Sequence, residues 1–467
     1  MAKPEWMEVV DSLLKKHGPD SAVVVYDQNP SETLDRLRKD KPRHVCVVAE
    51  PESLDRAFVV TMNRLTRKID DDIYGDCLWG IITGYEAKDA LRIASENKPL
   101  VLKSGLHTTG CDHETLERNM VISDGAQGRV ETREGREPRK DVMMPDNDEG
   151  TVFEFRKRWD EAEPDFMVTS SHATQYNLEM PFSRGLIVSY GNRFHALRKD
   201  QLRGFARFLG GAMFKGDEKD MIGFCETLRA PVLGDRGGRP GVWLGAGNCL
   251  LGDAKRSRNS MVVTALGGGG FNQLVGYVVP TWYGRMGWGT LNVFTGQGDR
   301  LSLAEAFFLN NQDILAETQR RFPKALDVEF NGDEISQWLK DEAAIKPLAE
   351  AGYLTKESSK DALGLTHDRD VVAFYGDPAW RAGFAKPAKP GYVLEFSKSG
   401  AGETVINVKN PGDAEWKGKV FCMLPVRMTA PACDAPNVTT ADDFALLNDL
   451  TLKPGETKTF TLVSAKS

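Results

Sequence analysis

The sequence contains no long apolar run, no excess of basic residues and few cysteines. No stretch approaches the ~20 apolar residues that a membrane-spanning helix needs, so we expect no membrane span. The net charge of −7, from 60 basic and 67 acidic residues, argues against nucleic acid as a partner, because a nucleic-acid site normally needs a basic face. These absences leave an ordinary globular protein.

The cysteines and the start of the chain bear on the cellular compartment. The seven cysteines are scattered and odd in number, unlike a disulfide framework. The first residues lack the basic segment and the following apolar segment of a signal peptide. We therefore expect a cytoplasmic protein, while a secreted protein whose leader had been removed would begin in the same way.

Strand-like and helix-like segments alternate over most of the 467 residues. This alternation predicts parallel βαβ units, and therefore an α/β fold with a mostly parallel sheet flanked by helices. Segment 124–150 is polar and expected to be a loop or an excursion of the chain, and 259–266 fits a helix or a strand. We expect helices over 4–17, 54–67, 85–96, 152–162, 199–209, 302–321 and 334–361, and strands over 21–26, 44–49, 79–84, 100–103, 186–189 and 271–280.

The character of the chain changes after about residue 384. Short alternating strands separated by turn residues follow, which is typical of a small antiparallel β-sandwich. The length also predicts two or three domains. We expect two α/β subdomains, over residues 1–98 and 99–384, followed by the sandwich over 385–467.

Two apolar runs end in small residues followed by a reactive side chain. Phe166-Met-Val-Thr-Ser-Ser leads to His172, and Gly241-Val-Trp-Leu-Gly-Ala-Gly-Asn leads to Cys249. Such runs are typical of buried parallel strands that deliver residues to the carboxyl edge of a sheet, where ligands bind. A cysteine and a histidine brought together by the fold are the smallest set of residues that supports catalysis by a thiolate. Cys249 is therefore the predicted nucleophile and His172 its base.

Four ordered segments make the chain similar to the gingipain-type cysteine peptidases, a branch of the caspase-like superfamily. They are Trp79-Gly-Ile-Ile-Thr-Gly-Tyr-Glu-Ala, the strand end at His172, Asn248-Cys249-Leu-Leu-Gly-Asp253 and Phe374-Tyr-Gly-Asp-Pro-Ala-Trp380. The resemblance implies a caspase-like catalytic subdomain over 99–384 and an immunoglobulin-like fold for the sandwich. It also implies an oxyanion hole built from the backbone N–H groups of Ala173 and Cys249.

The sequence departs from the family pattern next to the histidine. The family usually has glycine after the catalytic His, and this chain has Ala173. A non-glycine residue disfavours positive φ, so activity depends on the backbone conformation at Ala173. The separation between His172 and Cys249 is also longer than expected, with residues 211–240 as the apparent insertion.

The resemblance also indicates an acidic residue that selects the substrate. In the arginine-specific gingipains, an acidic residue at the carboxyl edge of the sheet neutralises the basic side chain of the substrate. The matching region contains Asp112, our first candidate, and Glu114, our second, while Asp124 is a weaker alternative. Asp112 and Glu114 could instead be carboxylates at a helix start, where the helix dipole favours negative charge.

Aromatic residues in the segment after strand 271–280 resemble the family's pocket wall. Trp282 and Trp288 lie among glycines in what we expect to be an exposed loop. Their faces would hold the aliphatic stem of a substrate side chain. Arg285 lies between them and would instead favour acidic groups.

Other residue patterns have simpler interpretations. Cys249 taken alone would be a buried structural thiol, and His195, a competing base, is more typical of a packing or capping residue before helix 199–209. Residues 267–270 are glycines followed by a strand-like run, which fits a helix end rather than a phosphate cradle. A loose cluster lacks the paired spacing of zinc sites, so we expect neither metal nor cofactor. Its members are His107, Cys111, Asp112 and His113.

The leading interpretation is a cysteine endopeptidase that forms an acyl-enzyme and cleaves peptide or protein substrates after a basic or otherwise selected side chain. Two alternatives stay open. One is a catalytically silent binding or scaffold protein, motivated by Ala173 and by the apparent lack of a pro-segment. The other is a different thiol-dependent acyl-transfer hydrolase, because acyl-enzyme chemistry serves amines as well as water. The sequence carries no signal for an oligomeric state.

Overall fold

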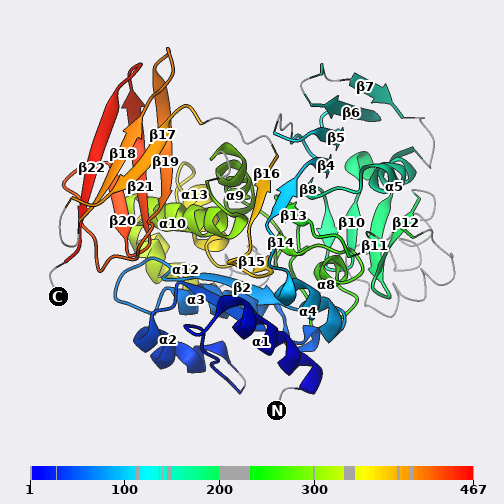
Figure 1. Ribbon diagram of the computed structural model, residues 1–467, viewed down its shortest axis with the longest axis horizontal. Helices are drawn as coiled ribbons and strands as arrows, with labels where there is room; N and C mark the ends of the chain where they lie inside the picture. The colour runs from blue at the N-terminus through cyan, green and yellow to red at the C-terminus, as the bar shows by residue number, and fades with distance from the viewer. Residues whose placement is uncertain are drawn as a thin grey trace.

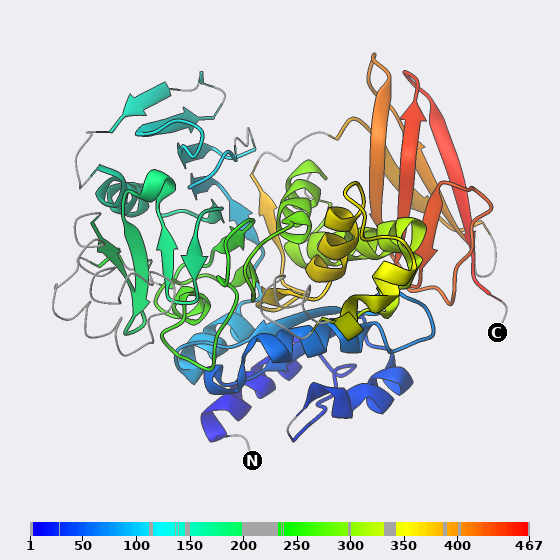
Figure 2. The ribbon, with the colours of Figure 1, turned by 180° about the vertical axis from the view of Figure 1, so that it is seen from behind.

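A computed structural model of the protein describes residues 3–27, 29–111, 115–135, 137–138, 140–144, 150–198, 232–234, 236, 238–297, 300–330, 342–385, 390–399 and 403–465. A large sheet with helices on both faces occupies the centre, and a β-sandwich built from the C-terminal residues lies at one end (Figure 1, Figure 2). None of the helices in the described part of the chain combines the length and apolar character that a membrane crossing requires.

The central sheet has ten strands in the order β1-β2-β15-β14-β13-β8-β4-β5-β6-β7. β1, β2 and β15 run parallel, β15 and β14 are antiparallel, and β14, β13, β8, β4 and β5 are again parallel. The sheet therefore confirms the predicted mostly parallel α/β fold. Its strands are β1 (His44–Val48), β2 (Leu78–Ile82), β4 (Ser104–His107), β5 (Arg118–Ile122), β6 (Arg129–Glu134), β7 (Lys140–Met143), β8 (Phe166–Thr169), β13 (Val242–Gly245), β14 (Gln273–Tyr277) and β15 (Val372–Tyr375).

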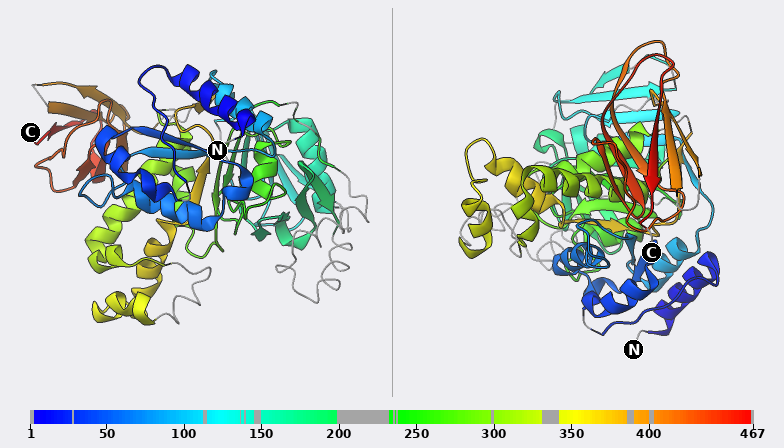
Figure 3. Two further views of the ribbon diagram at one scale, coloured as in Figure 1. Left: turned by 90° about the horizontal axis from the view of Figure 1, so that it is seen from below. Right: turned by 90° about the vertical axis from the view of Figure 1, so that its left-hand side faces the viewer.

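Alternation along β2 explains why both faces of the sheet are covered. Ile82 packs in one cluster with Trp6 of α1, whereas Ile81 belongs to the large core that includes Phe58 of α3. Successive strand residues point to opposite faces, so α1 and α4 cover one face and α3 and α10 the other (Figure 3). The helices are α1 (Pro4–His17), α2 (Leu34–Asp40), α3 (Arg56–Thr66), α4 (Ala87–Ser95), α5 (Gly150–Ala162), α8 (Met261–Leu266), α9 (Arg285–Gly296), α10 (Leu303–Arg321), α12 (Glu342–Glu350) and α13 (Ser359–Asp368), with 3-10 helices η1 (Pro30–Thr33), η2 (Pro51–Ser53), η3 (Pro181–Ser183) and η4 (Pro323–Asp327).

A smaller antiparallel sheet, ordered β12-β11-β10-β9, comes after β8 in the chain. Its strands are β9 (Ala173–Thr174), β10 (Asn177–Glu179), β11 (Leu186–Tyr190) and β12 (Arg193–Leu197), and a separate parallel pair joins β3 (Leu100–Leu102) to β16 (Ala382–Phe384). The β9–β10 hairpin brings the chain back beside the end of β8. It therefore forms a wall at this edge of the central sheet.

The C-terminal residues form the predicted small antiparallel β-sandwich. Its two sheets are β17-β18-β22 and β19-β21-β20, and their inner faces share a core that includes Ile406, Val420 and Leu447. Phe444 also packs edge-on against Tyr74 at 5.1 Å between ring centroids, which attaches the sandwich to the main body. The strands are β17 (Val393–Ser397), β18 (Glu403–Lys409), β19 (Trp416–Met423), β20 (Val438–Ala441), β21 (Phe444–Leu452) and β22 (Thr457–Val463).

The predicted division into residues 1–98, 99–384 and 385–467 stays a prediction. The central sheet itself runs without a break from β2, in the first segment, to β15 and β14, in the second. β15 and β14 are antiparallel, so the strands on either side of this pair run in opposite directions.

Two local predictions are wrong for physical reasons. Residues 21–26 form no strand, and Val25 is 86% exposed. The run of valines favours a strand, but these residues do not add to the edge of the central sheet, because β1 pairs with β2 alone in the described part of the chain. Segment 124–150, expected to be a loop or an excursion of the chain, contains the paired strands β6 and β7, whose many charges suit an edge of the sheet. The expected helix 199–209 and residues 334–341 of the helix 334–361 lie outside the described residues.

The Gly-Asp-Pro segment after β15 ties the end of α1 to the sheet. Asp377, only 1% exposed, forms an ion pair with Lys16 Nζ at 2.8 Å and accepts hydrogen bonds from His17 Nε2 at 2.9 Å and from the backbone N–H of Ala379. Burial by itself raises the pKa of Asp377, but the hydrogen bond from His17 and the charge of Lys16 outweigh it and hold the pKa well below its usual range. The carboxylate therefore contributes stability as an anion.

We expect Asp377→Asn to lower the free energy of unfolding by about 3 kcal/mol at pH 7, because it leaves a buried ammonium without its counter-charge. A depressed carboxyl pKa gives stability that is present above the unfolded value, near ~4, and is lost as the pH falls toward the folded value. Urea denaturation at pH 7 and at pH 3 should thus show that the free energies of unfolding of the wild type and of Asp377→Asn differ less at pH 3 than at pH 7. The control Asp11→Asn removes an exposed carboxylate of α1 and should change stability little; an equal loss in both variants would contradict the prediction.

Candidate active site

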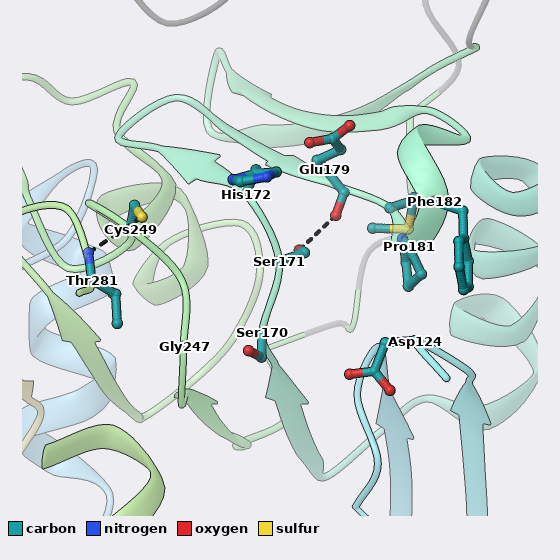
Figure 4. Close-up of a pocket in the computed structure, with 11 residues that line it drawn as sticks. Asp124, Ser170, Ser171, His172, Glu179, Pro181, Phe182, Gly247, Cys249 and Thr281 are labelled. Carbon is teal, nitrogen blue, oxygen red and sulfur yellow. Dashed lines mark hydrogen bonds between the residues drawn. The ribbon is translucent and has the colours of Figure 1, made fainter. Parts of the chain in front are cut away.

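A cavity of about 470 Å³ lies at the edge of the central sheet where β8 and β13 end. Because these two strands are adjacent and parallel, the residues immediately after them meet at one place. The β9–β10 hairpin, η3 and the loop after β14 complete the wall (Figure 4). The lining residues are Asp124, Ser170, Ser171, His172, Glu179, Met180, Pro181, Phe182, Gly247, Cys249 and Thr281.

Cys249 lies in a turn just after β13 and is half-buried. The backbone N–H of Thr281, from the loop after β14, donates to its Sγ at 3.2 Å (Figure 4). An N–H aimed at sulfur stabilises negative charge there. The next residue, Leu250, has φ 58°, a left-handed conformation that is strained for a branched side chain. Hydrogen bonds from Leu250 N–H to Val279 and from Gly252 N–H to Tyr277 hold this turn against β14.

His172 lies in the loop between β8 and β9, with an exposed side chain. Its carbonyl accepts a hydrogen bond from the N–H of Glu179 at 2.8 Å, so the two residues are direct partners across the hairpin. Figure 4 shows the imidazole between Cys249 and Glu179. His172 and Cys249, predicted from two distant strand ends, thus line the same cavity.

Ala173 lies in β9 and has an ordinary strand conformation, with negative φ. His172 and Glu179 form the hydrogen-bonded pair of the ladder, and hydrogen-bonded and non-hydrogen-bonded pairs alternate in an antiparallel hairpin. The next pair, Ala173 and Leu178, is therefore non-hydrogen-bonded. The Ala173 N–H consequently faces the outer edge of β9 rather than β10. Ala173 therefore carries no backbone strain.

Two carboxylates line the cavity. Asp124, exposed just beyond β5, accepts a hydrogen bond from Thr109 Oγ1 at 2.5 Å. Glu179 is 4% exposed, and its Oε1 has no hydrogen-bond partner among the described residues. Asp112 and Glu114, the first two candidates for substrate selection, lie outside the described residues. Sequence reasoning missed Glu179, although the short segment between His172 and Pro181 could have been predicted as a hairpin.

The two tryptophans lie beside the cavity rather than among its lining residues. The predicted exposed loop is partly wrong, because α9 begins at Arg285 and carries Trp288. Trp288 Nε1 is 3.4 Å from the position that a Cβ on Gly247 would take, so it packs behind a lining residue. Trp282 is 38% exposed. Arg285 pairs with Asp313 at 2.8 Å, which directs its charge to α10.

A distant cap explains why α9 forms where a loop was expected. Asp368, fully buried, accepts hydrogen bonds from the N–H of Met286 and from the hydroxyl of Tyr277. The Tyr277 oxygen in turn accepts from the N–H of Gly287. These groups satisfy the first N–H donors of the helix, yet they lie on β14 and α13.

The competing histidines make structural contacts. His195, on β12, has Nε2 3.2 Å from the carbonyl of Tyr190 and is not a lining residue of the cavity. His107, buried on β4, accepts the N–H of Val168 at its Nδ1, 3.0 Å away. That nitrogen's lone pair is therefore already engaged.

Two groups among the described residues have side chains close enough to hold a metal ion, and both lie outside the cavity. The first, His17, Cys46 and Asp377, has the ammonium of Lys16 2.8 Å from its carboxylate, which would repel a cation. The second is an acidic cluster where the sandwich meets the main body, Asp70, Asp76 and Asp442. Burial there, with the neighbouring charge of Asp70, raises the pKa of Asp76 to about 8.

The chain was compared with known proteins. No family model matches it, and neither does any curated protein. One similar solved structure is described as a protease; it is 10% identical, with 99% of this chain and 93% of that chain covered and a TM-score of 0.38. Another is the Arg-specific cysteine proteinase gingipain R, 8% identical, with 99% and 89% covered and a TM-score of 0.37. A likeness at this level assigns neither an activity nor the role of any residue.

Proposed function

We propose that this protein is a cysteine endopeptidase of the gingipain type, with Cys249 as nucleophile and His172 as base. One observation carries the proposal. The two side chains come from neighbouring parallel strands, share one cavity, and a main-chain N–H is aimed at the sulfur. Buried structural thiols do not normally face a cavity together with an exposed imidazole.

The geometry supports acyl-enzyme chemistry. His172 would take the proton of the Cys249 thiol, and the thiolate would attack the scissile carbonyl carbon. The resulting oxyanion would accept hydrogen bonds from backbone N–H groups, for which Ala173 and Cys249 are the candidates. His172 would then protonate the leaving amine, and water would release the acyl group with return of the proton to sulfur.

Substrate preference is inferred from the charge of the cavity. Asp124 and Glu179 are the acidic residues that line the cavity, and Arg285 is held by Asp313. A basic side chain would be attracted there by Coulomb forces. We therefore propose cleavage after arginine or lysine, with Asp124 as the selecting residue because its carboxylate is exposed.

The test is covalent labelling followed by peptide cleavage. A peptidyl acyloxymethyl ketone with a terminal arginine should label the protein once, and mass spectrometry should locate the label on Cys249. A peptide library should then show cleavage products. No label together with an intact library would contradict the peptidase proposal. Products ligated to added amines instead of hydrolysed would favour the acyl-transfer alternative.

The selecting carboxylate makes a separate prediction. We expect Asp124→Asn to lower kcat/KM for arginine substrates at least about tenfold, with little change for substrates that have an uncharged residue there, because only the charge pair is lost. Glu117→Gln, which neutralises an exposed carboxylate just before the other end of β5, is the matched control. Equal losses for charged and uncharged substrates would show that Asp124 does not select charge.

One of the two grounds for the catalytically silent alternative is Ala173. Since that residue has an ordinary strand conformation, the backbone supplies no reason for inactivity there. The labelling experiment distinguishes this alternative from an active peptidase.

A further inference from the structure

Asn248, immediately before Cys249, is fully buried and joins the two strand ends. Its Oδ1 accepts a hydrogen bond from the hydroxyl of Thr169, the last residue of β8. Its Nδ2 donates to the carbonyl of Ser171 at 2.9 Å. One amide thus spans from the residue next to the cysteine to the residue next to His172.

Further hydrogen bonds hold this bridge at both ends. Trp243, buried on β13, donates from Nε1 to Thr169 Oγ1 at 2.9 Å. On the other side, Ser171 Oγ donates to the carbonyl of Glu179 at 2.6 Å. The series Trp243, Thr169, Asn248 and Ser171 therefore crosses between β13 and the end of β8 and reaches β10. Buried networks whose members are satisfied restrict the relative position of the elements they join.

We propose that Asn248 is a positioning residue that sets the separation and orientation of Cys249 and His172. This inference rests on the proposed function, for which the two groups must meet in one geometry. Misplacement of reacting groups by about 1 Å reduces rates on the order of 100-fold. Asn248 has no exposed surface and is not a lining residue of the cavity, so it acts through its neighbours and not on the substrate.

The amide is the group that this position requires. Thr169 needs an acceptor, and the Ser171 carbonyl needs a donor, and an asparagine side chain offers both from one short planar group. Aspartate keeps an acceptor for Thr169 but turns a second acceptor toward the Ser171 carbonyl. Alanine leaves the hydroxyl hydrogen of Thr169 without its acceptor and the Ser171 carbonyl without the donor at position 248.

The test measures kcat, KM and the reactivity of Cys249. We expect Asn248→Asp to lower kcat about 30- to 100-fold and to leave KM within about twofold, because the substrate surface is intact. The ratio of iodoacetamide alkylation rates of Cys249 at pH 6.5 and pH 9 should fall several-fold, toward that of an ordinary thiol. A merely structural residue would not change this ratio.

Two further variants keep the proposal testable if Asn248→Asp folds poorly. Thr169→Ser keeps the hydroxyl and should retain activity, whereas Thr169→Val removes it and should lower kcat in the same direction. Asn410→Asp is the matched control, since Asn410 is a buried amide of the sandwich that donates to Ala414 and Leu452. It should affect stability and leave kcat unchanged.

The outcomes separate this inference from the proposed function. A wild-type protein that neither cleaves peptides nor takes the probe would overturn the peptidase proposal, and the alkylation ratio would still test the bridge. An unchanged ratio in Asn248→Asp would overturn the positioning role. So would a loss of kcat in Asn410→Asp equal to that in Asn248→Asp.

Discussion

Cys249→Ala is expected to abolish peptide cleavage, with kcat lowered about 10⁴-fold or more, the range seen when a nucleophile is removed. Without sulfur no thioester forms, and the backbone donors of the cavity have no tetrahedral intermediate to stabilise. Substrate binding should persist, because Asp124 and the cavity wall are unchanged. The measurement is the initial rate of release of a fluorescent group from an arginine peptide, together with probe labelling.

A second cysteine provides the control for Cys249. Cys433 is also half-buried, and it lies in the sandwich segment. Cys433→Ala should therefore keep wild-type rates and a full label. Residual cleavage in Cys249→Ala at more than about one hundredth of the wild-type rate would assign the activity to another group. Loss of activity in both variants would point to a general effect on folding.

The arrangement of the strand ends could be predicted from the sequence because it depends on local patterns. Continuous apolar runs before His172 and Cys249 are typical of strands buried on both faces, and β8 and β13 are indeed neighbours. Parallel pairing then places the residues after each strand at one edge of the sheet. The start of α10 was equally predictable, since Ser302 and Glu305 form a capping box.

The walls of the cavity could not be predicted in the same way, because they depend on contacts between distant segments. The cap of α9 comes from Asp368 and Tyr277, and no local signal indicates it. The donor on Cys249 is the main-chain N–H of Thr281, which any residue type except proline could supply. Asp124 was the weakest of three acidic candidates on sequence grounds and lines the cavity, whereas Asp112 and Glu114 lie outside the described residues.

Asn248 lies in a segment that the sequence analysis recognised, but its own role could not be predicted. In the sequence it was part of the segment that leads to Cys249, without a role of its own. Its side chain gains significance only when β8 and β13 are paired, because both of its partners lie on the other strand end. Sequence patterns therefore locate reactive groups more easily than the groups that align them.

The second large effect is expected for His172→Ala, which should lower kcat about 10³-fold, the middle of the 10²–10⁴ range of general acid–base catalysis. The loss is smaller than for Cys249, because the Thr281 N–H still stabilises charge on sulfur and hydroxide can take the proton. The rate should consequently rise with pH over the range in which an ordinary thiol ionises, near ~8.5, instead of passing through a plateau near neutrality.

His195→Gln is the control that distinguishes the two histidines. His195 lies on β12 and contacts the Tyr190 carbonyl, so its replacement should leave both kcat and the pH profile unchanged. If His172→Ala keeps the wild-type profile while His195→Gln loses it, the base has been assigned to the wrong histidine. If both keep it, the Cys249 thiolate forms without either imidazole, and the main-chain donor of Thr281 becomes the principal activating group. The pair of pH profiles therefore decides whether the site works as a Cys/His dyad.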